Sequence, residues 1–323
     1  MSDYDMRILT GNANPKLAAD IAAYLGMSLS EMEVSRFSDG EIRVKVNESV
    51  RGADVFVVQP TCPPASDNVM ELLIIIDALK RASARRIVAV VPYYGYARQE
   101  KKAGGREPIT ARLMADLLTV AGAHRILAVD MHVPSIQGFF NLPVDHLNAG
   151  PLLAEYFITR GFADADTVVV SPDVGGVGAA RAVADRLDAS LAIIAKRRPQ
   201  PNQAEIIEVI GDLNGKRAIF FDDMIDTAGS LVSGARAVAE RGAAEIYACA
   251  THGIFSDDAI LRLADSPIRE VVVTDTIPLA SERRIEKVKV LSVAPLLAEA
   301  IRRVHEDASV SSLFDRQWVE DKR

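Results

Sequence analysis

The stretch AIFFDDMIDTAGSL, Ala218–Leu231, decides the fold of this chain. Its apolar start predicts a buried strand that ends at Asp222, and the residues from Ser230 onward predict the start of a helix. The connecting segment is short and rich in small residues. A strand that leads into a helix through such a turn is the repeating unit of α/β folds, so the same alternation is expected elsewhere in the chain.

Apolar runs do alternate with helix-like segments along the whole sequence. The runs are continuous instead of alternating between polar and apolar residues, which favours parallel strands covered by helices on both faces. We therefore predict an α/β protein of two domains, each with a largely parallel doubly wound sheet. The expected strands are Arg7–Thr10, Asp54–Gln59, Ile87–Pro92, Arg125–Asp130, Thr167–Pro172, Leu191–Lys196, Ala218–Asp222, Ile246–Thr251 and Val271–Asp275, and the expected helices are Pro15–Leu25, Asp67–Ala84, Pro108–Ala121, Gly178–Leu187, Ser230–Arg241, Asp257–Ala264 and Pro295–Val304.

The length of 323 residues also favours two domains over one. Proline, asparagine and glycine cluster in residues 141–151, and this cluster predicts a boundary. We expect an N-terminal domain over residues 1–145 and a C-terminal domain over residues 146–323. The sequence leaves open whether the last helix packs back onto the first domain.

Charge and composition exclude several classes of protein. A net charge of −7 argues against a nucleic-acid partner, so any phosphate site has to be built locally. Cys62 and Cys249 lack the spacing of a zinc site or a disulfide framework. The N-terminus has no basic segment followed by an apolar run, and charged residues such as Glu71 interrupt the longest apolar stretches. We therefore expect a cytoplasmic protein without a signal peptide or a membrane span.

The turn after the first quoted strand has the features of an anion site. Residues 227–230 lead into the expected helix, whose first backbone N–H groups lack helical acceptors and attract anions. Asp222 and Asp223 stand beside this turn and can accept hydrogen bonds from vicinal sugar hydroxyls. The combination suits a phosphorylated ribose. Taken alone, an ordinary turn with a Thr or Ser N-cap explains it equally well.

Two other expected strands end in polar residues, and ligands of parallel sheets bind beyond such carboxyl ends. Asp130 and His132 should share one face, since strand side chains alternate, and together they can hold a divalent cation. A lone histidine more often only caps a loop. Asp173 precedes Gly175 and Gly176, which permit a close approach of the backbone to a pyrophosphate, although the segment alone is an unremarkable glycine turn.

Longer strings make the chain similar to known families. The segment Asp222–Ser230 has two acidic residues, two apolar residues and then Asp-Thr-Ala-Gly-Ser. This pattern resembles the phosphoribosyl pyrophosphate loop of type I phosphoribosyltransferases. Six segments, in order and spread over nearly the whole chain, resemble the ribose-phosphate pyrophosphokinase family. They are FSDGE (Phe37–Glu41), YARQEKK (Tyr96–Lys102), VDMHVPSIQGFF (Val129–Phe140), SPDVGG (Ser171–Gly176), KRRP (Lys196–Pro199) and DDMIDTAGS (Asp222–Ser230).

The resemblance implies an activity, a cofactor and partners. The expected reaction transfers the pyrophosphoryl group of ATP to the anomeric hydroxyl of ribose 5-phosphate, giving phosphoribosyl pyrophosphate and AMP for nucleotide biosynthesis. It implies Mg²⁺ as the cofactor and two phosphoribosyltransferase-like domains, the first on the ATP side and the second on the ribose 5-phosphate side. It also implies a homohexamer, with ADP and phosphate as effectors at Ser309–Phe314. Without the resemblance, that last segment predicts only a strand or coil.

The same resemblance assigns roles to single residues. Phe37 would stack on adenine while Asp39 and Glu41 accept from its exocyclic amine, although a plain hairpin explains this turn without a ligand. The polar segment 98–106 would be a lid over the ATP phosphates. The implied sets are Phe37, Asp39, Gly40, Glu41, Arg98 and Gln99 for ATP; Arg198, Asp222, Asp223, Asp226, Thr227, Ala228, Gly229 and Ser230 for ribose 5-phosphate; Asp130, His132 and Asp173 for the metal; and Lys196, Arg198 and His132 for catalysis.

Two other functions compete with this hypothesis. A non-catalytic paralogue would only assemble with active subunits, and the presence of His132 and Lys196 argues against it. A phosphoribosyltransferase would consume phosphoribosyl pyrophosphate, and the FSDGE and YARQ segments favour an ATP site instead.

Overall fold

The computed structural model describes residues 4–197 and 206–314, which form two compact units. Unit 1 contains the residues up to Asn148, together with Thr276–Pro278 and the segment that begins at Ser292. Unit 2 contains Ala149–Asp275 and Leu279–Leu291. The chain thus first leaves unit 1 after Asn148, a few residues beyond the expected end of the first domain.

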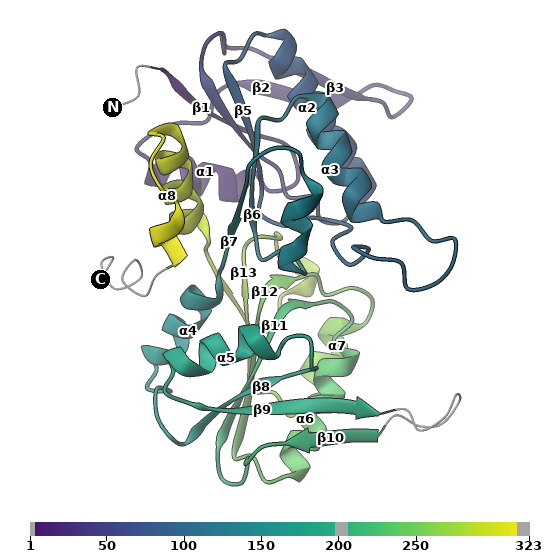
Figure 1. The fold of residues 1–323 in the computed structure, drawn as a ribbon, viewed down its shortest axis with the longest axis vertical. Helices are drawn as coiled ribbons and strands as arrows, with labels where there is room; N and C mark the ends of the chain where they lie inside the picture. Colours follow the sequence, from purple (N-terminus) through teal and green to yellow (C-terminus); the bar gives the residue numbers. More distant parts are fainter. Residues whose placement is uncertain (1–3, 198–205, 315–323) are drawn as a thin grey trace. The chain divides into compact units, whose positions relative to one another are not determined.

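Unit 1 is built on a five-stranded parallel sheet with the order β1-β4-β5-β6-β7. β4, with the sequence DVFVV, is buried along its whole length, as expected for a central strand covered on both faces. Figure 1 shows α2 and α3 on one face of this sheet and α1 and α8 on the other. The strands are β1 (Met6–Thr10), β4 (Asp54–Val58), β5 (Arg86–Val91), β6 (Arg125–Val129) and β7 (Val144–Leu147), and the helices are α1 (Pro15–Tyr24), α2 (Ala65–Arg81), α3 (Thr110–Ala121) and α8 (Ala294–His305).

An antiparallel hairpin completes unit 1. Its strands are β2 (Met32–Arg36) and β3 (Ile42–Val46), joined by the turn Phe37–Glu41. Short 3-10 helices follow at Pro134–Phe139, and near the end of the chain at Ser311–Phe314. The last of these replaces the strand or coil that the local sequence predicted.

Helix α8 is fastened to unit 1 by a buried carboxylate at the start of β4. Asp54 is fully buried and accepts from Nη2 of Arg86 at 2.6 Å, while Nδ1 of His305 lies 3.0 Å from it. Nη2 of Arg86 also donates to the carbonyl oxygen of Val304 at 2.8 Å. Burial raises the pKa of Asp54, but the hydrogen bonds from Arg85, Arg86 and His305 outweigh it, so the net pKa lies below its ordinary value.

Unit 2 is built on a seven-stranded sheet with the order β10-β9-β8-β11-β12-β13-β14, in which only β10 runs antiparallel to its neighbour. One face carries α4 and α5, and the other carries α6 and α7 (Figure 1). The strands are β8 (Thr167–Ser171), β9 (Ser190–Arg197), β10 (Ile206–Ile210), β11 (Arg217–Ile225), β12 (Glu245–Gly253), β13 (Glu270–Thr274) and β14 (Val288–Leu291), and the helices are α4 (Gly150–Ile158), α5 (Val177–Arg186), α6 (Gly229–Glu240) and α7 (Ala259–Ala264).

These two units confirm the predicted α/β class and the largely parallel sheets. Several elements were not predicted, namely β7, α4, β10 and β14. Helix α2 begins at Ala65, directly after Pro64, and not at Asp67 as expected. Of the helices described, none combines the length and the apolarity needed to cross a bilayer.

Candidate active site

An acidic cluster lies at the carboxyl edge of the unit 2 sheet. Asp222 and Asp223 belong to β11 itself, because the pairing of β11 with β12 continues as far as Ile225 opposite Gly253. The prediction that this strand ends at Asp222 is therefore wrong. The backbone N–H of Asp223 donates to Oδ1 of Asp222 at 2.8 Å, which brings the two acidic residues into direct contact.

Asp222 holds its proton unusually tightly. Burial, the interaction with Asp223 and the negative charge of Asp173 together raise the pKa of Asp222 to about 8. Asp173 follows β8, the strand beside β11, and its Oδ1 accepts from the backbone N–H of Gly176 at 2.8 Å. Three acidic residues thus lie along this edge of the sheet, and Asp222 interacts electrostatically with the other two. Such a cluster calls for a ligand that brings hydrogen-bond donors or positive charge.

The turn that follows the acidic pair leads into α6 without a side-chain cap. Ala228 is the N-cap residue, its φ is 58° in the left-handed region, and no side chain caps the helix there. The alternative of an ordinary Thr or Ser N-cap is therefore wrong. The first N–H groups of α6 have no acceptor within the helix, which is the arrangement that binds phosphate groups.

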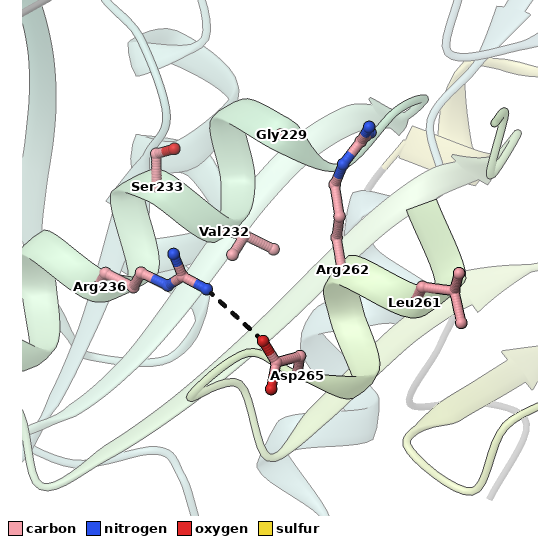
Figure 2. Close-up of a pocket in the computed structure, with 7 residues that line it drawn as sticks. All are labelled: Gly229, Val232, Ser233, Arg236, Leu261, Arg262 and Asp265. Carbon is pink, nitrogen blue, oxygen red and sulfur yellow. Dashed lines mark ion pairs between the residues drawn. The ribbon is translucent and has the colours of Figure 1, made fainter. Parts of the chain in front are cut away.

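A pocket opens beside this turn, between α6 and α7, with a volume of about 540 Å³. In Figure 2, Arg262 extends from α7 toward the start of α6 at Gly229, whereas Arg236 pairs with Asp265. Nη1 of Arg262 donates to the carbonyl oxygen of Thr227 at 2.7 Å. Sequence analysis did not single out Arg262, because nothing in the local pattern distinguishes it from a solvated arginine on a helix surface.

In unit 1, the segment Asp130–His132 follows β6 and is held by β7. The backbone N–H of Asp130 donates to the carbonyl oxygen of Leu147 at 2.9 Å, and that of Met131 donates to Nε2 of His146 at 2.9 Å. Asp130 has a φ of 39°, so the strand alternation assumed from the sequence ends at Val129. Burial lowers the pKa of His146, which keeps this acceptor neutral. His146 was missed by sequence analysis.

Glu100 connects the loop after β5 with His132. Burial raises the pKa of Glu100, but its own backbone N–H, Lys101 and the imidazole of His132 outweigh burial, and the net pKa lies below the ordinary value. The carboxylate of Glu107 accepts from the backbone N–H groups of Ala103 and Gly104, both at 2.8 Å. The loop and the segment around His132 therefore belong to one neighbourhood of unit 1.

Arg98 and Gln99 begin this loop, and both are exposed. Oε1 of Gln99 accepts from the hydroxyl of Thr110 at 2.5 Å, which ties the start of the loop to the first turn of α3. Tyr96 precedes them with a φ of 64°, and its hydroxyl lies 2.8 Å from Oγ of Ser66 in α2. The predicted ATP contacts are thus anchored to two helices.

The hairpin turn Phe37–Glu41 presents an aromatic ring to solvent. The N–H of Phe37 donates to the carbonyl oxygen of Glu41 at 2.8 Å, and Oδ1 of Asp39 accepts from the N–H of Glu41 at 3.1 Å. Gly40 has a φ of 95°, a conformation that favours glycine. The ring of Phe37 is 53 % exposed. This turn is a stiff support for an aromatic surface that a planar ligand can cover.

A buried polar network supports the base of this hairpin. The carboxylate of Glu71 accepts from the backbone N–H of Asn12 at 2.6 Å and from Nε2 of Gln59 at 2.9 Å. Nδ2 of Asn12 donates to the carbonyl oxygen of Val34 in β2 at 3.2 Å. A Cβ added to Gly11 would lie 2.3 Å from Oε1 of Gln59, so the network requires glycine there. From the sequence, we noted Glu71 only as a charged residue that interrupts an apolar stretch, and we did not predict this network.

The predicted site residues fall into two groups. Unit 1 holds Phe37, Asp39, Gly40, Glu41, Arg98, Gln99, Asp130 and His132, and unit 2 holds Asp173, Lys196 and residues 222–230. Lys196 lies in β9, which runs to Arg197. Arg198 lies outside the described residues.

Comparison with known proteins identifies the family. A family model described as the N-terminal domain of ribose phosphate pyrophosphokinase matches residues 6–122, and one described as the phosphoribosyl synthetase-associated domain matches residues 196–315. The ribose-phosphate pyrophosphokinase of Caldanaerobacter subterraneus subsp. tengcongensis is 62% identical over 309 residues, which cover 96% of this chain and 98% of that protein. The chain belongs to the ribose-phosphate pyrophosphokinase family.

Further relatives agree. The ribose-phosphate pyrophosphokinase of Bacillus subtilis is 54% identical over 312 residues, which cover 97% of this chain and 98% of that protein. The crystal structure of phosphoribosylpyrophosphate synthetase from Mycobacterium smegmatis matches 94% of this chain and 100% of that chain with 48% identity and a TM-score of 0.89. These matches confirm the family that the six sequence segments predicted, and with it an enzyme of two α/β domains.

The arrangement of the acidic side chains suits Mg²⁺, which is bound partly by water and substrate phosphates. It does not suit a metal that is bound by protein side chains alone. Within residues 4–197 and 206–314, no three His, Cys, Asp or Glu side chains gather into a metal-binding group. Mg²⁺ does not need such a cage, because it keeps several waters and commonly binds through one or two carboxylates together with substrate phosphates. Asp130 and Asp173 are carboxylates of this kind.

Proposed function

We propose that this chain transfers the pyrophosphoryl group of ATP to the anomeric hydroxyl of ribose 5-phosphate, with ATP on unit 1 and the sugar phosphate on unit 2. The products are phosphoribosyl pyrophosphate and AMP, and the reaction serves nucleotide biosynthesis. The observation that carries the proposal is the start of α6 at Ala228 without a side-chain cap, in the turn that follows β11 and its acidic pair, in a chain of this family.

The sugar phosphate would bind along the segment Asp222–Ser230. The carboxyl groups of Asp222 and Asp223 accept hydrogen bonds from the ribose hydroxyls, and Asp226 lies next to them in the turn. The 5-phosphate lies against the backbone N–H groups at residues 227–230, where the partial positive charge of the helix end favours an anion. The hydroxyls of Thr227 and Ser230 add two further donors.

ATP would bind through the hairpin turn and the loop after β5. The exposed ring of Phe37 supports stacking on adenine, and Asp39 and Glu41 accept from its exocyclic amine across the turn made by Gly40. Arg98 and Gln99 contact the nucleotide near the phosphates. The imidazole of His132 interacts electrostatically with the carboxylate of Glu100 in this loop.

One Mg²⁺ would be held by Asp130 and His132 in unit 1, and a second by Asp173 in unit 2. When bound with the substrates, such ions would neutralise phosphate charge and orient the transferred group. These side chains offer oxygen and nitrogen atoms as metal ligands at the carboxyl edges of the two sheets, where the strands hold them in place.

In the transfer step, the anomeric oxygen forms a bond to the β-phosphorus of ATP while the bond from that phosphorus to the oxygen bridging to the α-phosphate breaks. The sugar hydroxyl releases its proton to solvent water, and AMP leaves with the bridging oxygen. Transfers of this type depend on positioning and on charge stabilisation more than on covalent catalysis. We assign Lys196 and Arg198 to the stabilisation of charge on the transferring group.

A coupled measurement tests the proposal. The protein is incubated with Mg²⁺, ATP and ribose 5-phosphate, and AMP and phosphoribosyl pyrophosphate are quantified together by chromatography. The proposal requires equal amounts of both products and no reaction when the sugar phosphate is omitted. Asp223→Ala is the matched control for contaminating activity, and it should lose affinity for ribose 5-phosphate more than for ATP.

The other outcomes identify the competing functions. Binding of both substrates without AMP formation would point to a non-catalytic paralogue. Consumption of added phosphoribosyl pyrophosphate with a nucleobase would point to a phosphoribosyltransferase.

Location, assembly and regulation complete the proposal. We place the enzyme in the cytoplasm and expect it to assemble as a homohexamer. ADP and phosphate would act at the segment Ser309–Phe314, where the carbonyl oxygen of Ser309 accepts from Nη1 of Arg303 at 3.0 Å.

A further inference from the structure

The turn that would bind the sugar phosphate receives two donors from the segment after β12. The N–H of Ser256 donates to the carbonyl oxygen of Asp226 at 3.1 Å, and Nη1 of Arg262 donates to that of Thr227 at 2.7 Å. Both bonds use carbonyl oxygens of the turn. Neither bond involves an N–H group of the turn, and the N–H groups are the ones that an anion needs.

The bond from Arg262 has a specific geometric consequence. In a trans peptide the C=O and N–H groups point in opposite directions, so holding the oxygen of Thr227 toward Arg262 directs the N–H of Ala228 to the other side. Ala228 needs this support, because its φ of 58° is unfavourable for a residue with a side chain. A charged donor also polarises the peptide and strengthens its N–H as a donor.

Arg262 is well suited to this task by its surroundings. Its guanidinium reaches the turn from α7 along the pocket between α6 and α7, as Figure 2 shows. Nη2 of Arg262 lies 4.0 Å from Oδ2 of Asp258, one turn earlier on the same helix, a distance too long for a hydrogen bond. The hydrogen bond to the turn is the shorter and stronger of the two contacts.

We infer that Arg262 is a positioning residue for ribose 5-phosphate, which holds the Thr227–Ala228 peptide with its N–H directed at the phosphate. The inference rests on the proposed function, in which residues 227–230 bind the 5-phosphate. Arg262 acts through the peptide and does not touch the substrate, so its loss weakens binding of the sugar phosphate and leaves the ATP side intact.

Arg236 provides a matched control within the same pocket. It lines the pocket from α6, but its Nη2 lies 3.9 Å from Oδ2 of Asp265 and its side chain points to that residue (Figure 2). Arg236→Ala removes the same charge at a similar place without removing the bond to Thr227. The comparison therefore separates positioning of the peptide from a general effect of positive charge.

The experiment measures binding of ribose 5-phosphate and, separately, of ATP by isothermal titration calorimetry, with steady-state kinetics on the same proteins. Arg262→Ala should raise the Kd and the KM for ribose 5-phosphate about tenfold or more, as expected for a lost charged hydrogen bond. The Kd for ATP should change less than about twofold. Arg262→Lys, which keeps one charged donor, should recover part of the loss, and Arg236→Ala should match the wild type.

Each outcome decides between the ideas. Equal weakening by Arg262→Ala and Arg236→Ala, or equal loss for ATP and the sugar phosphate, would overturn the role of Arg262. If Arg262→Ala does not fold, the affinities of Arg262→Lys and Arg262→Gln for ribose 5-phosphate are compared with that of the wild type instead. Wild-type affinity in both variants would overturn the positioning role of Arg262. If the wild type itself does not bind ribose 5-phosphate, the proposed function fails instead.

Discussion

At the scale of single residues, the carboxyl group of Asp222 is costly to ionise when no ligand is bound. Burial, together with Asp223 and Asp173, raises its pKa from an ordinary value of 3.8 to about 8. A raised pKa in the folded state means that the folded protein holds the proton more tightly than the unfolded chain. The resulting stabilisation is complete below about pH 4 and is lost as the pH rises through about 8.

We therefore expect Asp222→Asn to raise the thermal unfolding midpoint at pH 9 by at least about 2 °C and to change it little at pH 4.5. The amide keeps the acceptor for the N–H of Asp223 but cannot ionise. Scanning calorimetry at both pH values measures the difference. Asp212→Asn, at an exposed position, is the control for the loss of one carboxylate far from this cluster. An equal change at both pH values for Asp222→Asn would contradict the assigned cause.

Lys196 is the second case at this scale. It lies near the end of β9, the neighbour of β8, at the same edge as Asp173. If its charge acts mainly in the transition state, Lys196→Ala should lower kcat at least roughly a hundredfold while changing KM for either substrate little. Steady-state kinetics with folded protein measures both constants. Lys289→Ala, an exposed lysine on β14, should behave as the wild type, and a near-normal kcat for Lys196→Ala would return that residue to an ordinary surface role.

At the scale of elements, the β2–β3 hairpin concentrates the proposed adenine contacts on one turn. Asp39 has two possible roles there, since its Oδ1 already accepts from the N–H of Glu41 and stiffens the turn. A substitution that keeps the turn but changes the base contact is needed to separate them. Asp39→Asn keeps the acceptor for Glu41 and replaces one carboxylate oxygen with a donor.

We expect both Asp39→Asn and Asp39→Ala to reduce the preference for ATP over GTP about tenfold, because an acceptor for the exocyclic amine is lost. The ratio of kcat/KM values for the two nucleotides is the measurement. Ser38→Ala, in the same turn, should leave the ratio unchanged. If only Asp39→Ala lowers activity, and does so equally for both nucleotides, Asp39 stiffens the turn and does not read the base.

At the scale of the whole molecule, α3 has an exposed apolar stripe. Leu113, Leu117 and Val120 are 53 %, 38 % and 77 % exposed, and their spacing places them on one face of the helix. Ile109, just before the helix, is 38 % exposed and continues the stripe. A contiguous apolar surface of this kind is typical of a protein interface, which supports self-association.

We expect the protein to have about six times the mass of one chain by light scattering, and Leu113→Glu combined with Leu117→Glu to lower that mass and the activity together. Burying two carboxylates in an apolar interface is strongly unfavourable. The double variant Leu113→Met and Leu117→Met keeps the surface apolar and should retain both properties. A wild-type monomer with full activity would exclude the assembly, and an unchanged mass for the glutamate variant would remove α3 from the interface.

Much of the fold could be predicted because its signals are local. Continuous apolar runs such as Val168–Val170 identify buried parallel strands, and the helices between them follow from periodicity and from turn residues. Helix α4 was missed because Gly150 and Pro151 suggested a break, whereas proline is favourable in the first turn of a helix. β7, with the sequence VDHL, is short and half polar, and it is a strand because β6 pairs with it.

By itself, the sequence determined the α/β class, the two largely parallel sheets, and the family, because periodicity and contiguous motifs need only neighbouring residues. The tertiary structure alone decided how far β11 extends, how strongly Asp222 holds its proton, and which donor supports the turn at Thr227. Arg262 and Thr227 are 35 positions apart in the chain, and Asp222 lies on β11 whereas Asp173 follows the neighbouring strand β8. Such contacts arise only when the sheet aligns its strands, so no local pattern contains them.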